Sequence, residues 1–179
     1  MKQIVLAVTG ASGSIYAKLM IDILAKKEDI QLHIIFSDTA KEVWLHETET
    51  PLPENLVDNR NFNFPFASGS NLLDCMIILP CSMGSLARIA SGISTDLISR
   101  VADVQLKERR KLLLTPRETP FSLIHLRNMT TLCEAGAIIA PIIPSYYKKP
   151  NTIENLTEAF CQRILQLCDI STMDEKNRW

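Results

Sequence analysis

Residues 1–20 read MKQIVLAVTGASGSIYAKLM, and this stretch decides the fold. A secretory leader needs an apolar run of roughly 7–15 residues. The apolar run at residues 4–8 is shorter than that, and the polar cluster TGASGS follows it at once. A buried strand that turns into a helix fits the same residues better. We therefore expect a strand over residues 4–8 and a helix that begins at Ser14.

Short apolar segments alternate with amphipathic segments along the rest of the chain. Further strands are expected at residues 32–36, 76–79, 112–115 and 137–140, and helices at 14–27, 39–46, 82–90, 95–109, 123–135 and 152–168. Apolar strands with little polar alternation are covered on both faces. Alternating strands and helices predict a parallel sheet with right-handed crossovers. The expected fold class is α/β: a three-layer, Rossmann- or flavodoxin-like parallel sheet with helices on both faces.

Charge and cysteine content exclude several classes of function. The 19 Lys and Arg against 20 Asp and Glu give a net charge of −1, which provides no general attraction to nucleic acid or to a membrane surface. No apolar run approaches the roughly 18 residues of a membrane span. The five cysteines form no CxxC pair and no metal-ligand spacing. We expect a reduced, cytoplasmic protein without membrane insertion, nucleic-acid binding or a metal site.

Hydroxyl groups, glycines and cations follow the expected strands. In order, these segments are TGASGS (9–14), Ser37, PCSMGS (80–85), PRETP (116–120) and PIIPSYYKKP (141–150). Ligands of open α/β sheets bind at the carboxyl ends of the strands. The set therefore indicates a site for a phosphate-bearing cofactor.

The first of these segments has the features of an anion-binding turn. We expect Gly10 to allow a sharp turn and Gly13 to allow close approach of a ligand. Ser12, Ser14 and the free N–H groups of the following helix can donate hydrogen bonds to an anion. A GxxG turn by itself is more typical of an ordinary strand-to-helix connection. The five segments together favour the binding site.

Four stretches carry a resemblance to a known family. They are TGASGSIYA (9–17), PCSMGSLARIASG (80–92), DLISRVADVQLKERRKLLLTPRETPFSLIHLRNM (96–129) and GAIIAPIIPSYYKKP (136–150). Together they resemble the flavin prenyltransferases of the UbiX type, within the superfamily of homo-oligomeric flavin-containing cysteine decarboxylases. The similarity runs from Lys2 to about residue 169. It implies a single flavoprotein domain over residues 1–179, with a C-terminal arm at about 169–179 that ends in Trp179.

The resemblance also implies an activity. Members of this family join the dimethylallyl group of dimethylallyl phosphate to N5 and C6 of reduced FMN, without a metal. The product, prenylated FMN, serves UbiD-type decarboxylases, including those of ubiquinone biosynthesis. A homo-oligomer, by resemblance a dodecamer, is expected.

Site residues follow from the resemblance position by position. FMN is expected to contact Gly10, Ala11, Ser12, Ser37, Ser82, Met83, Gly84, Ser85 and Arg117. Dimethylallyl phosphate is expected to contact Arg100, Lys107, Tyr147 and Arg163. Catalytic roles are implied for Glu47, Glu118 and Ser12. Taken singly, each has an ordinary explanation: helix caps for the serines, and surface charges for the ionic groups.

Two other functions remain open on sequence grounds. A flavin-dependent decarboxylase of a peptidyl or pantothenoyl cysteine would carry a catalytic histidine after the second strand and a PASANT loop after the third. His46 is near the right place, but the loop here reads PCSMGS. A non-catalytic flavin-binding subunit would not require the two glutamates and the four prenyl-phosphate residues. An aromatic ring is expected over the prenyl group, and Phe62, Phe64 and Phe66 are equal candidates.

Overall fold

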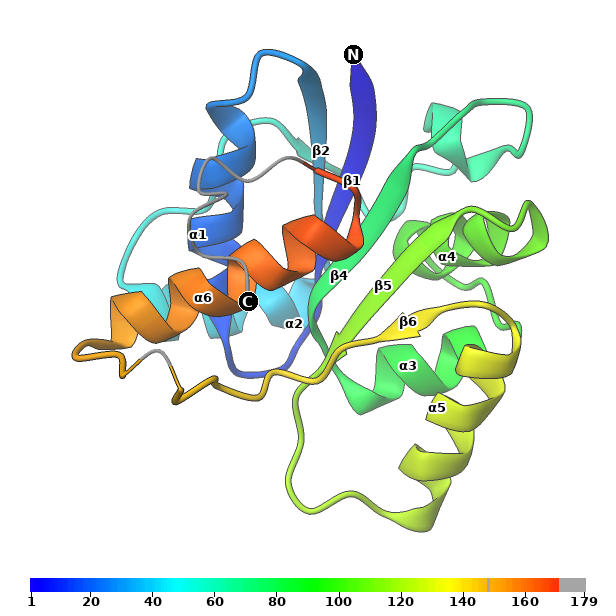
Figure 1. The fold of residues 1–179 in the computed structure, drawn as a ribbon. Coiled ribbons are helices and arrows are strands. Elements are labelled where there is room, and N and C mark those ends of the chain that lie inside the picture. The colour runs from blue at the N-terminus through cyan, green and yellow to red at the C-terminus, as the bar shows by residue number, and fades with distance from the viewer. Residues whose placement is uncertain (148, 171–179) are drawn as a thin grey trace.

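The computed structural model describes residues 1–147 and 149–170, which form a parallel sheet between two layers of helices (Figure 1). The strands are β1 (Lys2–Val8), β2 (Ile30–Phe36), β3 (Leu56–Val57), β4 (Cys75–Cys81), β5 (Lys111–Pro116) and β6 (Ile138–Ile139). The helices are α1 (Ser14–Ala25), α2 (Asp38–Thr48), α3 (Met83–Ala90), α4 (Leu97–Lys107), α5 (Leu123–Glu134) and α6 (Ile153–Leu167), with a 3₁₀ turn η1 (Pro65–Ala67). The expected α/β class is confirmed. Most of the expected C-terminal arm, including Trp179, lies outside the described residues.

The sheet has the order β3-β2-β1-β4-β5-β6, with every pair parallel. The chain builds outward from β1 to one edge and then returns to add β4 on the other side of β1. The connections therefore diverge at the carboxyl ends of β1 and β4. In an open parallel sheet, this switch in strand order is where a ligand-binding crevice forms.

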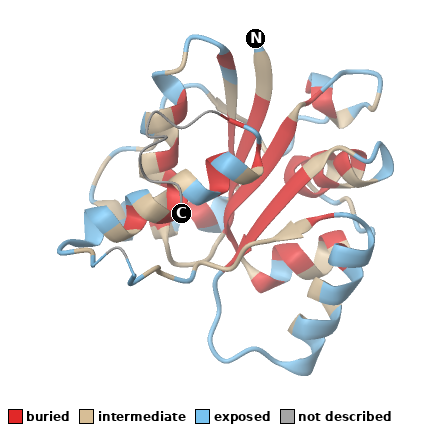
Figure 2. Ribbon diagram, viewed as in Figure 1, coloured by how far each residue is buried: buried red, intermediate tan, exposed pale blue. Residues whose placement is uncertain are grey.

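Alternate residues of the strands divide the core into two layers. Val5, Ala7 and Ile78 face the layer that contains α3, α4 and α5. Ile4 and Leu6 face the layer that contains α1 and α6. Figure 2 shows the central strands buried along most of their length. Such double coverage explains why these strands read as continuous apolar runs rather than as alternating patterns.

The structure adds one strand that the sequence pattern did not predict. β3 pairs with β2 through two residues, Leu56 and Val57, inside the region 50–70 that was expected to be irregular. Two residues are too few to display a period of two.

None of the helices over the described residues is long and apolar enough to cross a membrane.

Candidate functional site at the carboxyl edge of the sheet

Three helices begin at the carboxyl edge of the sheet, directly after β1, β2 and β4. Gly13 is the N-cap of α1, Ser37 that of α2, and Ser82 that of α3. The Ser37 hydroxyl accepts a hydrogen bond from the Ala40 N–H at 3.1 Å. The N–H groups at each helix start lack a partner within the helix backbone, and each start carries a partial positive charge. The convergence of three such ends makes this edge suitable for an anion.

The two glycines of the β1–α1 turn differ from expectation, because the sharp turn was expected at Gly10. Gly13 has a φ of 125° and therefore provides the unusual turn, while Gly10 has no positive φ. A Cβ on Gly10 would lie 2.6 Å from Cγ2 of Thr39, in α2. Gly10 thus allows close approach of the neighbouring helix.

Glu47 lies at the start of α1, although it is far away in the sequence. Its Oε2 accepts hydrogen bonds from the backbone N–H of Gly13 at 3.0 Å and of Ser14 at 2.7 Å. Burial acts to raise the pKa of this carboxyl, but hydrogen bonds from the Ser12 side chain and from these N–H groups outweigh it, and the pKa is lowered. The structure thus brings together Ser12 and Glu47, two residues with expected catalytic roles.

Thr9, which the sequence argument did not single out, connects the ends of β1 and β4. Its hydroxyl donates to the carbonyl of Pro80 at 3.0 Å and accepts from the N–H of Ser82 at 2.7 Å. Thr9 is 1% exposed. This contact fixes the first turn of α3 relative to the β1–α1 turn. The Ser82–Ser85 segment therefore lies across the switch point from Gly10–Ser14.

The loop after β5 carries Arg117 and Glu118 at the same edge. The Arg117 N–H donates to the carbonyl of Cys81 at 3.3 Å, which places this loop beside the end of β4. The side chains of Arg117 and Glu118 form no ion pair among the described residues. Within the described part of the chain, the Glu118 side chain accepts one local hydrogen bond, from the Thr119 N–H at 2.9 Å. Both residues are exposed, so their charged groups can reach a bound ligand.

The four residues expected to hold the prenyl phosphate do not meet within one chain. Arg100 and Lys107 lie on α4, which packs on one face of the sheet. Arg163 lies on α6, which packs on the opposite face. Tyr147 follows β6 and is 59% exposed. The sheet itself therefore separates the two α4 cations from Arg163 (Figure 1).

The α4 cations also have contacts within the chain. Arg100 donates to the carbonyl of Ala67 at 3.0 Å and pairs with Asp103 at 2.9 Å. Lys107 pairs with Glu108 next to it. Both side chains remain about one-third or more exposed, at 35% and 46%. They are thus held in place while still presenting charge to solvent.

The structure distinguishes among the three candidate phenylalanines. Phe64 and Phe66 are buried and pack edge-on against each other and against His33, with ring centroids 5.2–5.4 Å apart. Phe62 is 48% exposed. Two of the three rings therefore have a packing role in the core. Phe62 is the one available to a ligand.

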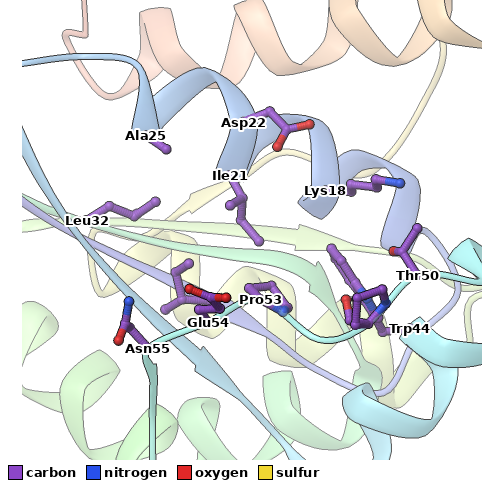
Figure 3. A pocket seen from close by; sticks show the side chains of 12 residues that line it. Lys18, Ile21, Asp22, Ala25, Leu32, Trp44, Thr50, Pro53, Glu54 and Asn55 are labelled. Carbon is purple, nitrogen blue, oxygen red and sulfur yellow. The ribbon is translucent and has the colours of Figure 1, made fainter.

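Two cavities lie elsewhere on the molecule. One, of about 510 Å³, opens between α1 and the segment from α2 to β3, beside Ile21, Trp44 and Pro53 (Figure 3). The other, of about 420 Å³, lies between the C-terminal ends of α4 and α5. Lys107 and the residues expected to contact FMN line neither cavity. The described residues contain no cluster of three or more His, Cys, Asp or Glu side chains that could hold a metal.

Comparisons with known proteins agree with this geometry. The family model described as Flavoprotein matches residues 1–165. The flavin prenyltransferase UbiX of Methanocaldococcus jannaschii is 40% identical over 99% of this chain and 98% of its own length. A solved structure of AnUbiX (PadA1), in complex with FMN and dimethylallyl pyrophosphate, is 40% identical and superposes with a TM-score of 0.93 over 99% of this chain and 98% of that one.

A second solved structure, a dodecameric FMN-dependent UbiX-like decarboxylase from Escherichia coli O157:H7, is 32% identical with a TM-score of 0.93, over 99% of this chain and 98% of that one. The parallel sheet and the match to the Flavoprotein family define a flavoprotein of the α/β class. The 40% sequence identity to a flavin prenyltransferase, over nearly the full length of both chains, shows which family of flavoproteins this is. The chain belongs to the UbiX family of flavin prenyltransferases.

Proposed function

We propose that this protein is a flavin prenyltransferase, which joins the dimethylallyl group of dimethylallyl phosphate to N5 and C6 of reduced FMN. The observation that carries the proposal is the meeting of three helix N-termini at the switch point of the sheet. The 40% identity to AnUbiX, which was solved with FMN and dimethylallyl pyrophosphate, supports the choice of substrates. A cysteine decarboxylase is disfavoured because the relatives above 30% identity include proteins named flavin prenyltransferase.

The residues at the carboxyl edge fit the demands of FMN. The β1–α1 turn at Gly10, Ala11 and Ser12 would hold it, together with the Ser37 hydroxyl, the segment Ser82, Met83, Gly84 and Ser85, and the Arg117 guanidinium. The short side chains of Ala11, Ser12, Ser37 and Ser82 leave room for a dianion. Reduced FMN supplies the nucleophilic nitrogen and carbon when bound. The protein's part is to orient it and to handle protons.

We assign proton handling to the two glutamates. A leaving phosphate needs an acid, and the flavin C6 proton needs a base. Glu118 is exposed and has no cation paired with it among the described residues, so its carboxylate can face the reacting atoms. Glu47 and Ser12 share a hydrogen bond at the start of α1, where Ser12 can hold or pass a proton.

We further propose that Arg100 and Lys107 reach the prenyl phosphate from a neighbouring subunit. Tyr147 and Arg163 would grip the same phosphate from the first subunit, and Phe62 would lie over the allyl group. The support is the separation of α4 and α6 by the sheet within one chain. A phosphate cannot contact both helices of one subunit through that sheet.

Exposed apolar side chains support a homo-oligomer, with the dodecamer of the 32%-identical relative as its expected form. Of the twelve residues of α5, only Leu132 is buried. Leu123 and Ile124 on this helix are 60% and 68% exposed, and Figure 2 shows the helix and the loop before it largely exposed. A helix that buries so little in its own chain requires another surface to cover it. We propose a cytoplasmic enzyme of one domain, whose product goes to a UbiD-type decarboxylase.

The proposal is tested by anaerobic incubation with reduced FMN and dimethylallyl phosphate, followed by mass spectrometry of the flavin. The expected result is a flavin heavier by one dimethylallyl group less one hydrogen, because the prenyl alkene takes up one proton when the ring closes, with EDTA leaving the rate unchanged. Recovery of unmodified FMN, while a peptidyl cysteine loses carbon dioxide, would show decarboxylation instead. Recovery of unmodified FMN with neither reaction would show a flavin-binding subunit.

A further inference from the structure

The Ser85 hydroxyl has both of its acceptor positions occupied within the chain. The Ser82 hydroxyl donates to Ser85 Oγ at 3.1 Å, and Nη2 of Arg88 donates to the same oxygen at 3.1 Å. A hydroxyl has two acceptor lone pairs and one O–H donor. Ser85 therefore has only its donor left, and no hydrogen bond of the described residues uses it. Ser85 is 5% exposed, so bulk water does not readily provide the acceptor.

Arg88 is placed for this contact at some cost to its own hydrogen bonding. Its Nε is buried and has no hydrogen-bond partner among the described residues. Nη2 is 3.6 Å from Oδ2 of Asp96, outside the range of a good hydrogen bond, while its contact to Ser85 is shorter. A buried donor without a partner is unfavourable. The contact between Arg88 and Ser85 is thus the closest polar contact of this guanidinium among the described residues.

We propose that Arg88 is a positioning residue of the flavin site, which directs the Ser85 O–H toward an acceptor oxygen or nitrogen of bound FMN. The inference rests on the proposed function, in which Ser82–Ser85 line the flavin. With Arg88 in place, Ser85 acts only as a donor. Without Arg88, one lone pair becomes free, the hydroxyl can rotate, and its hydrogen bond to the flavin is weakened.

A purely structural role for Arg88 makes a different prediction. In that case Arg88 would serve to hold α3 against the start of α4 through Asp96. In the wild type, Oδ1 of Asp96 caps α4 by accepting a hydrogen bond from the Ser99 N–H at 2.8 Å. Asp96→Asn removes the negative charge that faces Arg88 but keeps a side-chain oxygen that can accept this hydrogen bond. This variant is the matched control, because it alters the α3–α4 contact and leaves the donor to Ser85 in place.

The test is a titration of apoprotein with FMN, in which quenching of the flavin fluorescence reports binding. It is carried out on Ser85→Ala, Arg88→Met and the double variant. Each single substitution is expected to raise the Kd for FMN about 3–10-fold, the effect of one net hydrogen bond. The double variant should equal Ser85→Ala, because Arg88 acts through Ser85. Arg88→Lys should restore part of the affinity, and Asp96→Asn should bind FMN as the wild type does. The visible flavin spectrum should shift in the same variants that lose affinity.

The outcomes separate this inference from the proposed function. Wild-type protein that fails to bind FMN overturns both. Wild-type protein that binds FMN, with Arg88→Met unchanged in Kd and spectrum, overturns the inference alone. Additive losses in the double variant, or a loss in Asp96→Asn equal to that in Arg88→Met, also overturn it. Thermal melting of each apoprotein identifies a variant that fails to fold, and Arg88→Lys then provides the test.

Discussion

At the scale of single residues, the sequence predicted which residues lie at the carboxyl edge of the sheet better than it predicted what each of them does there. Ser37 and Ser82 lie at helix starts after strands, as the hydroxyl-rich segments indicated. The reasons for Gly10 and Gly13 were exchanged, because a close contact with Thr39 depends on a helix whose position no local pattern specifies. Arg88 was missed for the same reason. A single arginine on a helix looks like a surface charge until its neighbours are known.

Glu118→Gln should separate proton handling from flavin binding. The amide keeps the shape of the side chain but cannot take a proton at neutral pH. We expect FMN to remain tightly bound, while the prenylation rate falls roughly 10²–10⁴-fold. Absorbance of the purified protein and single-turnover mass spectrometry measure the two effects. A variant that loses FMN, while its remaining holoprotein reacts at the wild-type rate, would contradict the assignment.

Glu47→Gln should make the stability of the apoprotein less dependent on pH. The pKa of Glu47 is lowered in the folded chain, so its stabilising effect is present above the unfolded pKa of about 4.3 and is lost as pH falls through the folded value. A carboxylate at a helix N-terminus is worth about 0.3–1 kcal/mol. Wild type should therefore melt a few degrees above the variant at pH 7, and the difference should shrink below pH 4. Glu42→Gln, on the exposed part of the same helix, is the control. A difference that grows toward low pH would contradict the assignment.

At the scale of elements, the long buried strands and most helices were predictable because their apolar residues recur regularly. β3 was not, since it consists of two residues whose place is fixed by pairing with β2. Phe64 and Phe66 illustrate the same limit. Their burial against His33 depends on how the loop of residues 58–71 folds over the sheet. The amino-acid sequence alone therefore does not distinguish them from Phe62.

Arg163→Ala tests which ligand the middle of α6 serves. Arg163 is exposed and makes one weak contact, to Gln166 Oε1 at 3.3 Å, so its removal should not disturb the helix. A charge-assisted hydrogen bond to phosphate contributes roughly 1.5–3 kcal/mol. The apparent affinity for dimethylallyl phosphate should fall about 10–100-fold, with FMN retention unchanged. Separate titrations of the two ligands measure this, with Glu158→Ala on the same helix as the control. Loss of FMN with normal prenyl-phosphate saturation would place Arg163 in the other half of the site.

At the scale of the whole molecule, the resemblance predicted a phosphate site whose residues one chain does not bring together. The resemblance assigned Arg100, Lys107 and Arg163 to one phosphate, and the fold places α4 and α6 on opposite faces of the sheet. No sequence pattern states that two residues of a motif belong to different subunits. The conflict appears only when the sheet order and the two core layers are known. Assembly through the exposed α5 surface would resolve it.

A mixture of two variants that are each impaired at low dimethylallyl phosphate should therefore recover activity. If Lys107 and Arg163 serve one phosphate from different subunits, oligomers of Lys107→Ala alone and of Arg163→Ala alone lack one cation at every site. Subunits that are mixed, dissociated and reassembled should restore both cations at roughly a quarter of the sites, since a heterologous interface draws the two halves of each site from different copies. Turnover of the reassembled mixture at low dimethylallyl phosphate measures this, and each variant carried through the same treatment alone is the control. Activity no higher than the mean of the two controls would show that both cations act within one subunit or that one of them is not part of the site.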